Sequence, residues 1–221
     1  MASQVDFYQI LYKEEQRAKI YPFATPYFNQ TLTPFFENSI IAEVVPQSTA
    51  DKIAVCSWAI DQKRVTMNTG NREPIREENL YLDYDIASFT KNTRNHQMLE
   101  AMDSWHKGSK ELLKLICLKI GVKWVSEIKF PIYQNAFCAR REIYQDYVAT
   151  ALKPAMEAME TKFKDQCWQD SGYYKLKNPG DDYAQRVKQF LGVDYCPLHP
   201  FLLERLFSVW ISTRNFNVIY I

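Results

Sequence analysis

Glycine is scarce in this chain, with 6 residues among 221. Neither G-x-G-x-x-G nor G-x-x-x-x-G-K-[ST] occurs, which excludes an ordinary Rossmann dehydrogenase or a P-loop ATPase, because both hold phosphate in a glycine-rich loop. Histidine is rarer still, with 3 scattered residues and no pair at metal-ligand spacing. These few histidines define no Ser/His/Asp or Cys/His arrangement.

An excess of charge and a long apolar run are both missing as well. The 27 Lys and Arg residues balance 26 Asp and Glu residues, which argues against binding to nucleic acid through bulk charge. No apolar run approaches the roughly 20 residues of a membrane span, and residues 1–13 carry no signal-peptide pattern, so we expect no membrane span and a cytoplasmic location. The cysteines form no Cys-x-x-Cys pair, and we expect five reduced, packed thiols: Cys56, Cys117, Cys138, Cys167 and Cys196.

Apolar periodicity predicts alternating strands and helices. Strands are expected at 51–58, 80–90 and 217–221, a strand or turn at 131–139, and helices at 97–120, 140–160, 182–191 and from Pro200 onward. Gly108 should break the first helix, and Pro154 should kink or split the second. The alternation predicts a single α/β or α+β domain over residues 1–221, and α/β is the fold class expected.

Residues 1–50 are expected to form an irregular segment rich in aromatic residues and proline. The spacing of Phe7, Ile10 and Leu11 predicts a short amphipathic helix over 7–19. The segment 21–36 (YPFATPYFNQTLTPFF) contains three prolines, which favour extended or turn backbone. Its rings are expected to pack on the core, and the alternative is a surface that stacks on sugars or bases.

Three short patterns carry candidate chemistry. Asp83-Tyr84-Asp85 could hold a divalent metal, Mn²⁺ or Mg²⁺, that bridges a nucleotide diphosphate, and the alternative is a solvated edge. Glu204-Arg205 interrupts an apolar helix, as either its solvent face or a buried pair whose carboxylate acts as a general base. Arg140-Arg141 could clamp phosphate at a helix start, or could be merely solvated.

Four segments together resemble a family of glycosyltransferase-like proteins with a GT-A-like fold from bacterial capsule and lipopolysaccharide gene clusters. Their order and rough spacing agree over about the last three quarters of the chain, and the last two are the most specific: DKIAVCSW (51–58), DYDIASFTK (83–91), NAFCARREIYQDY (135–147) and FLLERLFSVWISTRNFNV (201–218). The resemblance implies a GT-A-like, Rossmann-like mixed sheet flanked by helices. It also implies a transferase that takes a nucleotide-sugar donor and a glycan or surface-polysaccharide acceptor.

The resemblance implies that Asn135, Glu204 and Arg205 lie near the site. Trp58 is a further candidate for substrate binding. The chain reads Ser57-Trp58-Ala59-Ile60 where the family has His-Tyr-Arg-Arg, and it shows no counterpart to the family's amino-terminal nucleotide-binding strand. The leading hypothesis is a glycosyltransferase with Glu204 as base. The alternative is a non-catalytic binding or assembly protein, encoded by a virus or mobile element, that retains the scaffold.

Overall fold

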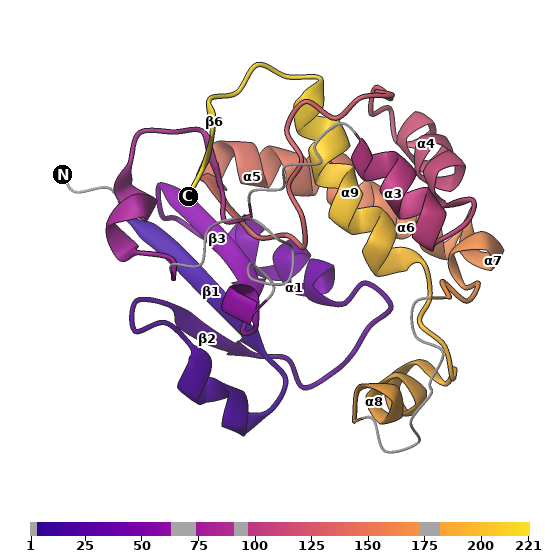
Figure 1. Ribbon diagram of the computed structural model, residues 1–221, viewed down its shortest axis with the longest axis horizontal. Coiled ribbons are helices and arrows are strands. Elements are labelled where there is room, and N and C mark those ends of the chain that lie inside the picture. Colours follow the sequence, from indigo (N-terminus) through magenta and orange to yellow (C-terminus); the bar gives the residue numbers. More distant parts are fainter. Residues whose placement is uncertain (1–3, 63–73, 91–96, 173–181) are drawn as a thin grey trace.

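A computed structural model describes residues 4–62, 74–90, 97–172 and 182–221 (Figure 1). The strands are β1 (Val5–Leu11), β2 (Thr25–Phe28), β3 (Lys52–Ser57), β4 (Ile86–Ser88), β5 (Phe137–Arg140) and β6 (Val218–Tyr220). The α-helices are α1 (Glu37–Val44), α3 (Met98–Trp105), α4 (Ser109–Lys119), α5 (Arg141–Tyr147), α6 (Lys153–Glu160), α7 (Lys164–Cys167), α8 (Asp182–Leu191) and α9 (His199–Ser212). The shorter elements are the 3-10 helices η1 (Glu14–Lys19), η2 (Val45–Gln47) and η3 (Glu77–Tyr81), and the π-helix η5 (Val148–Leu152).

The strands form one six-stranded mixed sheet in the order β2-β1-β3-β5-β4-β6. β1 pairs in parallel with both β2 and β3, and β4 pairs in parallel with β6. β5 is antiparallel to both of its neighbours, so it runs against the other five strands. We call the end of the sheet where those five strands finish and β5 begins the carboxyl edge, and the opposite end the amino edge.

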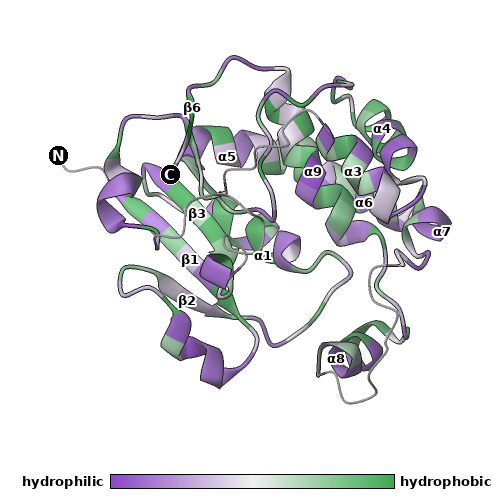
Figure 2. Cartoon of the chain, in the orientation of Figure 1, coloured by the Kyte–Doolittle hydropathy of each residue, from purple (hydrophilic) through white to green (hydrophobic). Residues whose placement is uncertain are grey.

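Helices cover one face of the sheet. Ile53 and Val55 of β3, with Phe137 of β5, belong to the core cluster that also contains the apolar residues of α1, α5 and α9. The Phe137 ring stacks on Phe207 of α9 at 3.9 Å between centroids. Figure 2 shows hydrophobic colour along β3 and much of α9, mixed colour along β1 and α8, and hydrophilic colour on α7. The fold is therefore an α/β domain with a mixed sheet flanked by helices, as the sequence pattern predicts.

Irregular chain covers the other face. Ala54, Cys56 and Cys138 point to that side, where they join a second cluster with Phe7 and Tyr84. Tyr21 and Phe23 of the aromatic segment stack on each other at 5.0 Å, and Phe23 lies 5.6 Å from the Phe7 ring. These rings confirm the expected packing on the core. All five cysteines are buried free thiols, as predicted.

The predicted break at Gly108 is confirmed, whereas Pro154 does not split its helix. Gly108 separates α3 from α4 with a φ of 84°, in the left-handed region that favours glycine. The helix over 141–160 is continuous and changes to the π-helix η5, which ends two residues before Pro154, whose missing N–H cannot join the α-helical ladder. Within the described residues, no helix is long and apolar enough to span a membrane.

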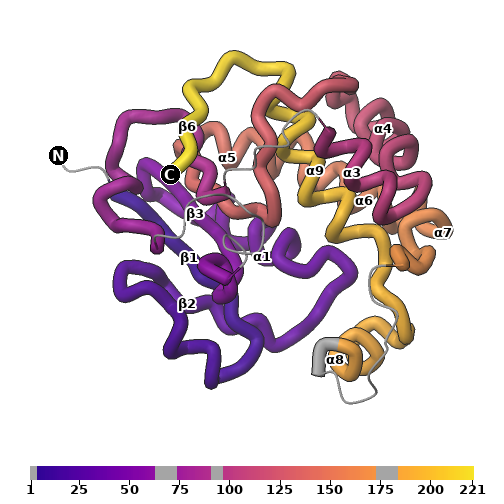
Figure 3. The backbone as a smooth tube through the Cα atoms, viewed as in Figure 1, coloured from indigo at the N-terminus to yellow at the C-terminus, as the bar shows by residue number. Residues whose placement is uncertain are grey.

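The prediction for the amino-terminal segment is wrong. Residues 5–11 form β1 in the middle of three parallel strands. Of the helix predicted over 7–19, only residues 14–19 are helical, as a 3-10 helix. Phe7 and Ile10 pack on opposite faces of the sheet, so the helix-like spacing arises from a strand buried on both sides. Residues 1–50 therefore supply β1, β2 and α1 rather than an irregular segment, and Figure 3 shows this indigo-to-purple chain building one side of the sheet. The expected strand over 80–90 is shortened to β4, because η3 occupies 77–81.

Candidate functional site

The structure separates the predicted site residues into two groups. Trp58 directly follows β3, and its backbone N–H donates to the Ile10 carbonyl near the end of β1 at 2.8 Å. Asn135 lies two residues before β5, so it shares the carboxyl edge with Trp58. The acidic and basic residues Asp83, Asp85, Arg140 and Arg141 all lie at the amino edge, because β4 begins there and β5 ends there.

Helix α9 brings Glu204 and Arg205 to the carboxyl-edge group. The Ile132 N–H donates to Ser208 Oγ at 2.9 Å, and the Ser208 hydroxyl donates back to the Ile132 carbonyl at 3.2 Å. This reciprocal contact fastens α9 to the segment that leads into β5. One turn earlier on α9, the Arg205 guanidinium lies over the Tyr133 ring at 5.2 Å. The pair therefore lies beside the residues that precede Asn135.

Glu204 and Arg205 form a largely enclosed ion pair. Arg205 Nη1 donates to Glu204 Oε2 at 2.6 Å, and the side chains are 14% and 19% exposed for Arg205 and Glu204 respectively. Consecutive helical residues normally diverge, so this pairing requires both side chains to bend toward each other. Arg205 Nε is buried and has no hydrogen-bond partner among the described residues. The guanidinium thus has donor capacity beyond its contact with Glu204.

A tight turn sets the backbone next to this pair. Gln134 and Asn135 both have positive φ values, 60° and 54°, and the Ala136 N–H donates to the Tyr133 carbonyl at 3.0 Å. Positive φ at both central residues with this hydrogen bond defines a type I′ turn, which glycine and asparagine favour. Gln134 adopts it without that preference, and its Oε1 is buried without a partner among the described residues. Strained backbone of this kind concentrates at functional sites.

His106 is buried beside the same ion pair, whereas the sequence indicates a helix-surface or capping histidine. Its ring packs on Phe201 at 3.9 Å between centroids, and Nδ1 lies 2.8 Å from the Ser171 carbonyl. Burial lowers its pKa, opposed by that hydrogen bond, and Arg205 and Glu204 act on it in opposite directions. Burial thus favours the neutral form of His106, which belongs to the surroundings of the pair. The sequence carries no signal for this placement, which depends on packing between α3 and α9.

Arg186 of α8 ties the ends of β1 and β2 together at the carboxyl edge. Its Nη1 donates to the Tyr12 carbonyl at 3.0 Å and its Nη2 to the Asn29 carbonyl at 3.4 Å. The guanidinium also lies over the Tyr12 ring at 4.9 Å, and burial raises the pKa of Tyr12 well above its ordinary value. Asn29 Nδ2 is buried without a partner among the described residues. Nothing in the local sequence distinguishes Arg186 from any other polar helix residue.

At the amino edge, Arg140 lies between the two predicted metal ligands. Its Nη2 is 3.0 Å from Asp83 Oδ1 and its Nε is 3.1 Å from Asp85 Oδ1. Asp85 also accepts from the Asn217 N–H at 2.9 Å, which links β4 to the approach to β6. Arg141 donates to the Thr49 carbonyl instead of facing a cleft.

The single positive charge of Arg140 is shared by the two carboxylates, so it competes with a cation for their oxygens. The described residues contain no group of three or more His, Cys, Asp or Glu side chains that could hold a metal ion. Arg140 and Arg141 likewise lie at the edge opposite Glu204, so they cannot offset phosphate charge there. Lys91, the basic residue that trails the second resembling segment, lies outside the described residues.

Comparison of the chain with protein-family models, with curated proteins and with solved structures found no match.

Proposed function

We propose that this protein is a glycosyltransferase that takes a nucleotide-sugar donor and works at the carboxyl edge of its sheet. The observation that carries the proposal is the enclosed Glu204–Arg205 pair, which α9 holds beside the turn at 134–135. In open α/β sheets, ligands bind outside the carboxyl ends of the strands. The pair offers at that edge the two groups that the reaction needs, a base and a phosphate-binding cation.

Glu204 acts as the general base toward the acceptor hydroxyl. The hydroxyl oxygen forms a bond to the anomeric carbon of the sugar, and the bond from that carbon to the diphosphate oxygen breaks with its electron pair staying on the diphosphate. The hydroxyl proton passes to the Glu204 carboxylate. Arg205, oriented by Glu204 through Nη1, donates its remaining N–H groups to the diphosphate as it leaves.

The Trp58 ring, at the same edge, provides a surface for the donor. Trp58 follows β3 and carries the Lys19 ammonium over its ring at 4.6 Å, which adds a cation beside that surface. Tyr133 lies under Arg205 and is buried in the core, so it supports Arg205 and does not face the donor. Flat rings of this kind pack against sugars and bases.

A thermal-shift panel tests the proposal. The melting temperature of the wild-type protein is measured with UDP, GDP, CMP or dTDP and with the corresponding nucleotide sugars. Each ligand is tested in the presence of Mn²⁺, Mg²⁺ or EDTA. A ligand at about 100 times its Kd stabilises the fold by ~2.7 kcal/mol, which corresponds to roughly 5–10 °C for a domain of this size. We expect one nucleotide class to raise the Tm.

Matched variants then separate the two roles. Arg205→Lys keeps the charge but not the planar fork, so it should weaken nucleotide binding about tenfold, ~1.4 kcal/mol. Glu204→Gln should keep nucleotide binding and lose sugar transfer, whereas Glu142→Gln, at an exposed position of α5, should change neither. Full transfer activity in Glu204→Gln would refute the base assignment. A flat nucleotide panel on folded wild-type protein would refute the proposal and favour a binding or assembly protein.

A further inference from the structure

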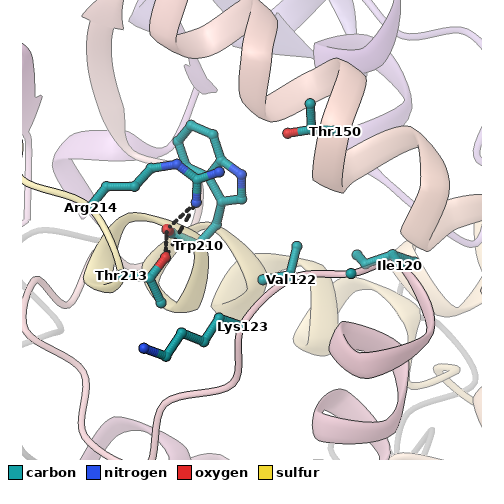
Figure 4. Close-up of a pocket in the computed structure, with 8 residues that line it drawn as sticks. Ile120, Val122, Lys123, Thr150, Trp210, Thr213 and Arg214 are labelled. Carbon is teal, nitrogen blue, oxygen red and sulfur yellow. Dashed lines mark hydrogen bonds between the residues drawn. The ribbon is translucent and has the colours of Figure 1, made fainter.

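A hollow lies away from the Glu204–Arg205 site, where α4 and α9 both end. It has a volume of about 410 Å³ and is bounded by the chain after α4, by the π-helix η5 and by the end of α9 (Figure 4). The described residues that line it are Ile120, Gly121, Val122, Lys123, Thr150, Trp210, Thr213 and Arg214. Trp210, which lines the pocket, stacks on Phe216, and two residues later the chain enters β6 from the amino edge. The pocket therefore lies toward the edge of the sheet opposite the proposed transferase site.

The lining is cationic. Lys123 and Arg214 are its charged residues, Thr150 and Thr213 add hydroxyl groups, and none of the described lining residues is acidic. Asp146, the carboxylate that acts on Arg214 from outside the lining, offsets part of one charge only. A pocket with this lining favours a ligand of negative charge.

Arg214 is held in place before any ligand arrives. Its Nη1 donates to the Trp210 carbonyl at 2.8 Å, and its guanidinium stacks on the Trp210 ring at 3.8 Å. Burial lowers the pKa of this guanidinium below its ordinary value. An anion placed against it would restore the solvation that burial has removed, at little cost in side-chain ordering.

The Trp210 indole supplies an independent sign of a missing partner. Trp210 is completely buried, and its Nε1 has no hydrogen-bond partner among the described residues. An indole N–H can only donate, so the group that would satisfy it is an acceptor. Figure 4 shows the nitrogen-bearing edge of the indole turned toward the side on which Thr150 lies. Thr150 belongs to the π-helix η5, and π-turns inside α-helices are frequent at functional sites.

We propose that this pocket binds a small molecule through an oxyanion, either a phosphate or a carboxylate group. The oxyanion contacts Arg214 and accepts the Trp210 Nε1–H, and the apolar wall of Ile120 and Val122 covers the remainder of the ligand. The Lys123 ammonium points away from Arg214 in Figure 4, and its exposed side chain turns toward the oxyanion when the ligand binds. This site is independent of the transferase proposal. It uses different residues at the opposite edge of the sheet, so either proposal can fail alone.

The experiment follows the Trp210 indole N–H by NMR in ¹⁵N-labelled protein, titrated in parallel with inorganic phosphate and with acetate. The signal is assigned among the five tryptophans through the neighbouring rings of Tyr147 and Phe216, which requires no core substitution. We expect a saturable shift with at least one anion, and the stronger of the two identifies the oxyanion class. Lys123→Gln should weaken that anion about fivefold, ~1 kcal/mol.

Lys119→Gln is the matched control. Lys119 is another exposed lysine, at the end of α4, and it is not among the lining residues. Because Lys123 is exposed, its replacement should leave the Tm unchanged. The proposal would be overturned if neither phosphate nor acetate shifts the indole signal at concentrations up to roughly 10 mM. Such a result would mean a binding free energy weaker than ~3 kcal/mol. Equal weakening by Lys119→Gln and Lys123→Gln would overturn it as well.

Discussion

The turn before β5 offers a test of whether Asn135 acts through its backbone or through its side chain. Asn135 is buried, with 4% exposure, and stands in the left-handed region at φ 54° beside Gln134 at φ 60°. We compare three variants: Asn135→Ala, Asn135→Gly and Gln134→Gly. Alanine and glycine both remove the amide, but only glycine adopts positive φ without a steric penalty.

The magnitudes follow from the two φ values. A residue with a Cβ in this region costs roughly 1–2 kcal/mol, and asparagine pays less than most. Asn135→Ala should therefore destabilise the fold by about 1 kcal/mol, whereas Asn135→Gly should stay within about 0.5 kcal/mol of wild type, because the relieved strain offsets the greater entropy of the unfolded chain. Gln134→Gly should stabilise by about 0.5–1 kcal/mol for the same reason.

Urea unfolding and thermal melts check these values, since ~1 kcal/mol shifts the Tm of a domain of this size by about 2–4 °C. If Asn135→Ala and Asn135→Gly lose stability equally, the turn argument is refuted and the amide itself is required. The same proteins are then tested for nucleotide binding. Retained binding in Asn135→Gly would assign Asn135 a backbone role, and loss of binding in a stable Asn135→Gly would assign its amide to the ligand.

Two further predictions concern residues outside that turn. Arg140→Ala should destabilise the fold by about 1 kcal/mol, since its ion pairs with Asp83 and Asp85 are partly exposed. The variant should keep its nucleotide affinity. A loss of affinity in folded Arg140→Ala would contradict the separation of the two edges. His199 is fully buried, and burial lowers its pKa below 6.5 although the Glu160 carboxylate at 2.8 Å opposes this. Its neutral form is the one that folding favours, so stability should fall as the pH drops below about 6.5, by at most ~1.4 kcal/mol per pH unit for this group. Urea unfolding at pH 7.5 and 5.5 should show a smaller acid loss in His199→Gln than in wild type, and an equal loss in both would exclude His199 as a source.

The sequence alone determined the features that depend on local backbone chemistry. Gly108 predicts the break between α3 and α4 because glycine tolerates positive φ, and Pro154, which lacks an N–H, marks the irregularity at η5 in the helix over 141–160. The apolar run over 51–58 predicts β3, which is buried along its whole length. In both cases the information lies within a few residues of the structure it produces.

The tertiary structure alone decided the assignment of β1. The spacing of Phe7, Ile10 and Leu11 fits a helix, but pairing with β2 on one side and β3 on the other makes the segment a strand. Long-range pairing overrides local periodicity when a strand is buried on both faces, because both faces must then be apolar. The same pairing supplies an amino-terminal parallel strand that the sequence pattern does not reveal.

The grouping of the candidate site residues was likewise beyond the sequence. The sequence predicts four charged residues as partners of Glu204: Asp83, Asp85, Arg140 and Arg141. They lie at the opposite edge of the sheet because β5 runs antiparallel to its neighbours. Strand direction is set by pairing between segments about fifty residues or more apart, and no local pattern records it. The sequence thus supplied the candidate residues. The fold decided that Glu204, Arg205, Asn135 and Trp58 share one edge, because only the assembled sheet defines where its edges are.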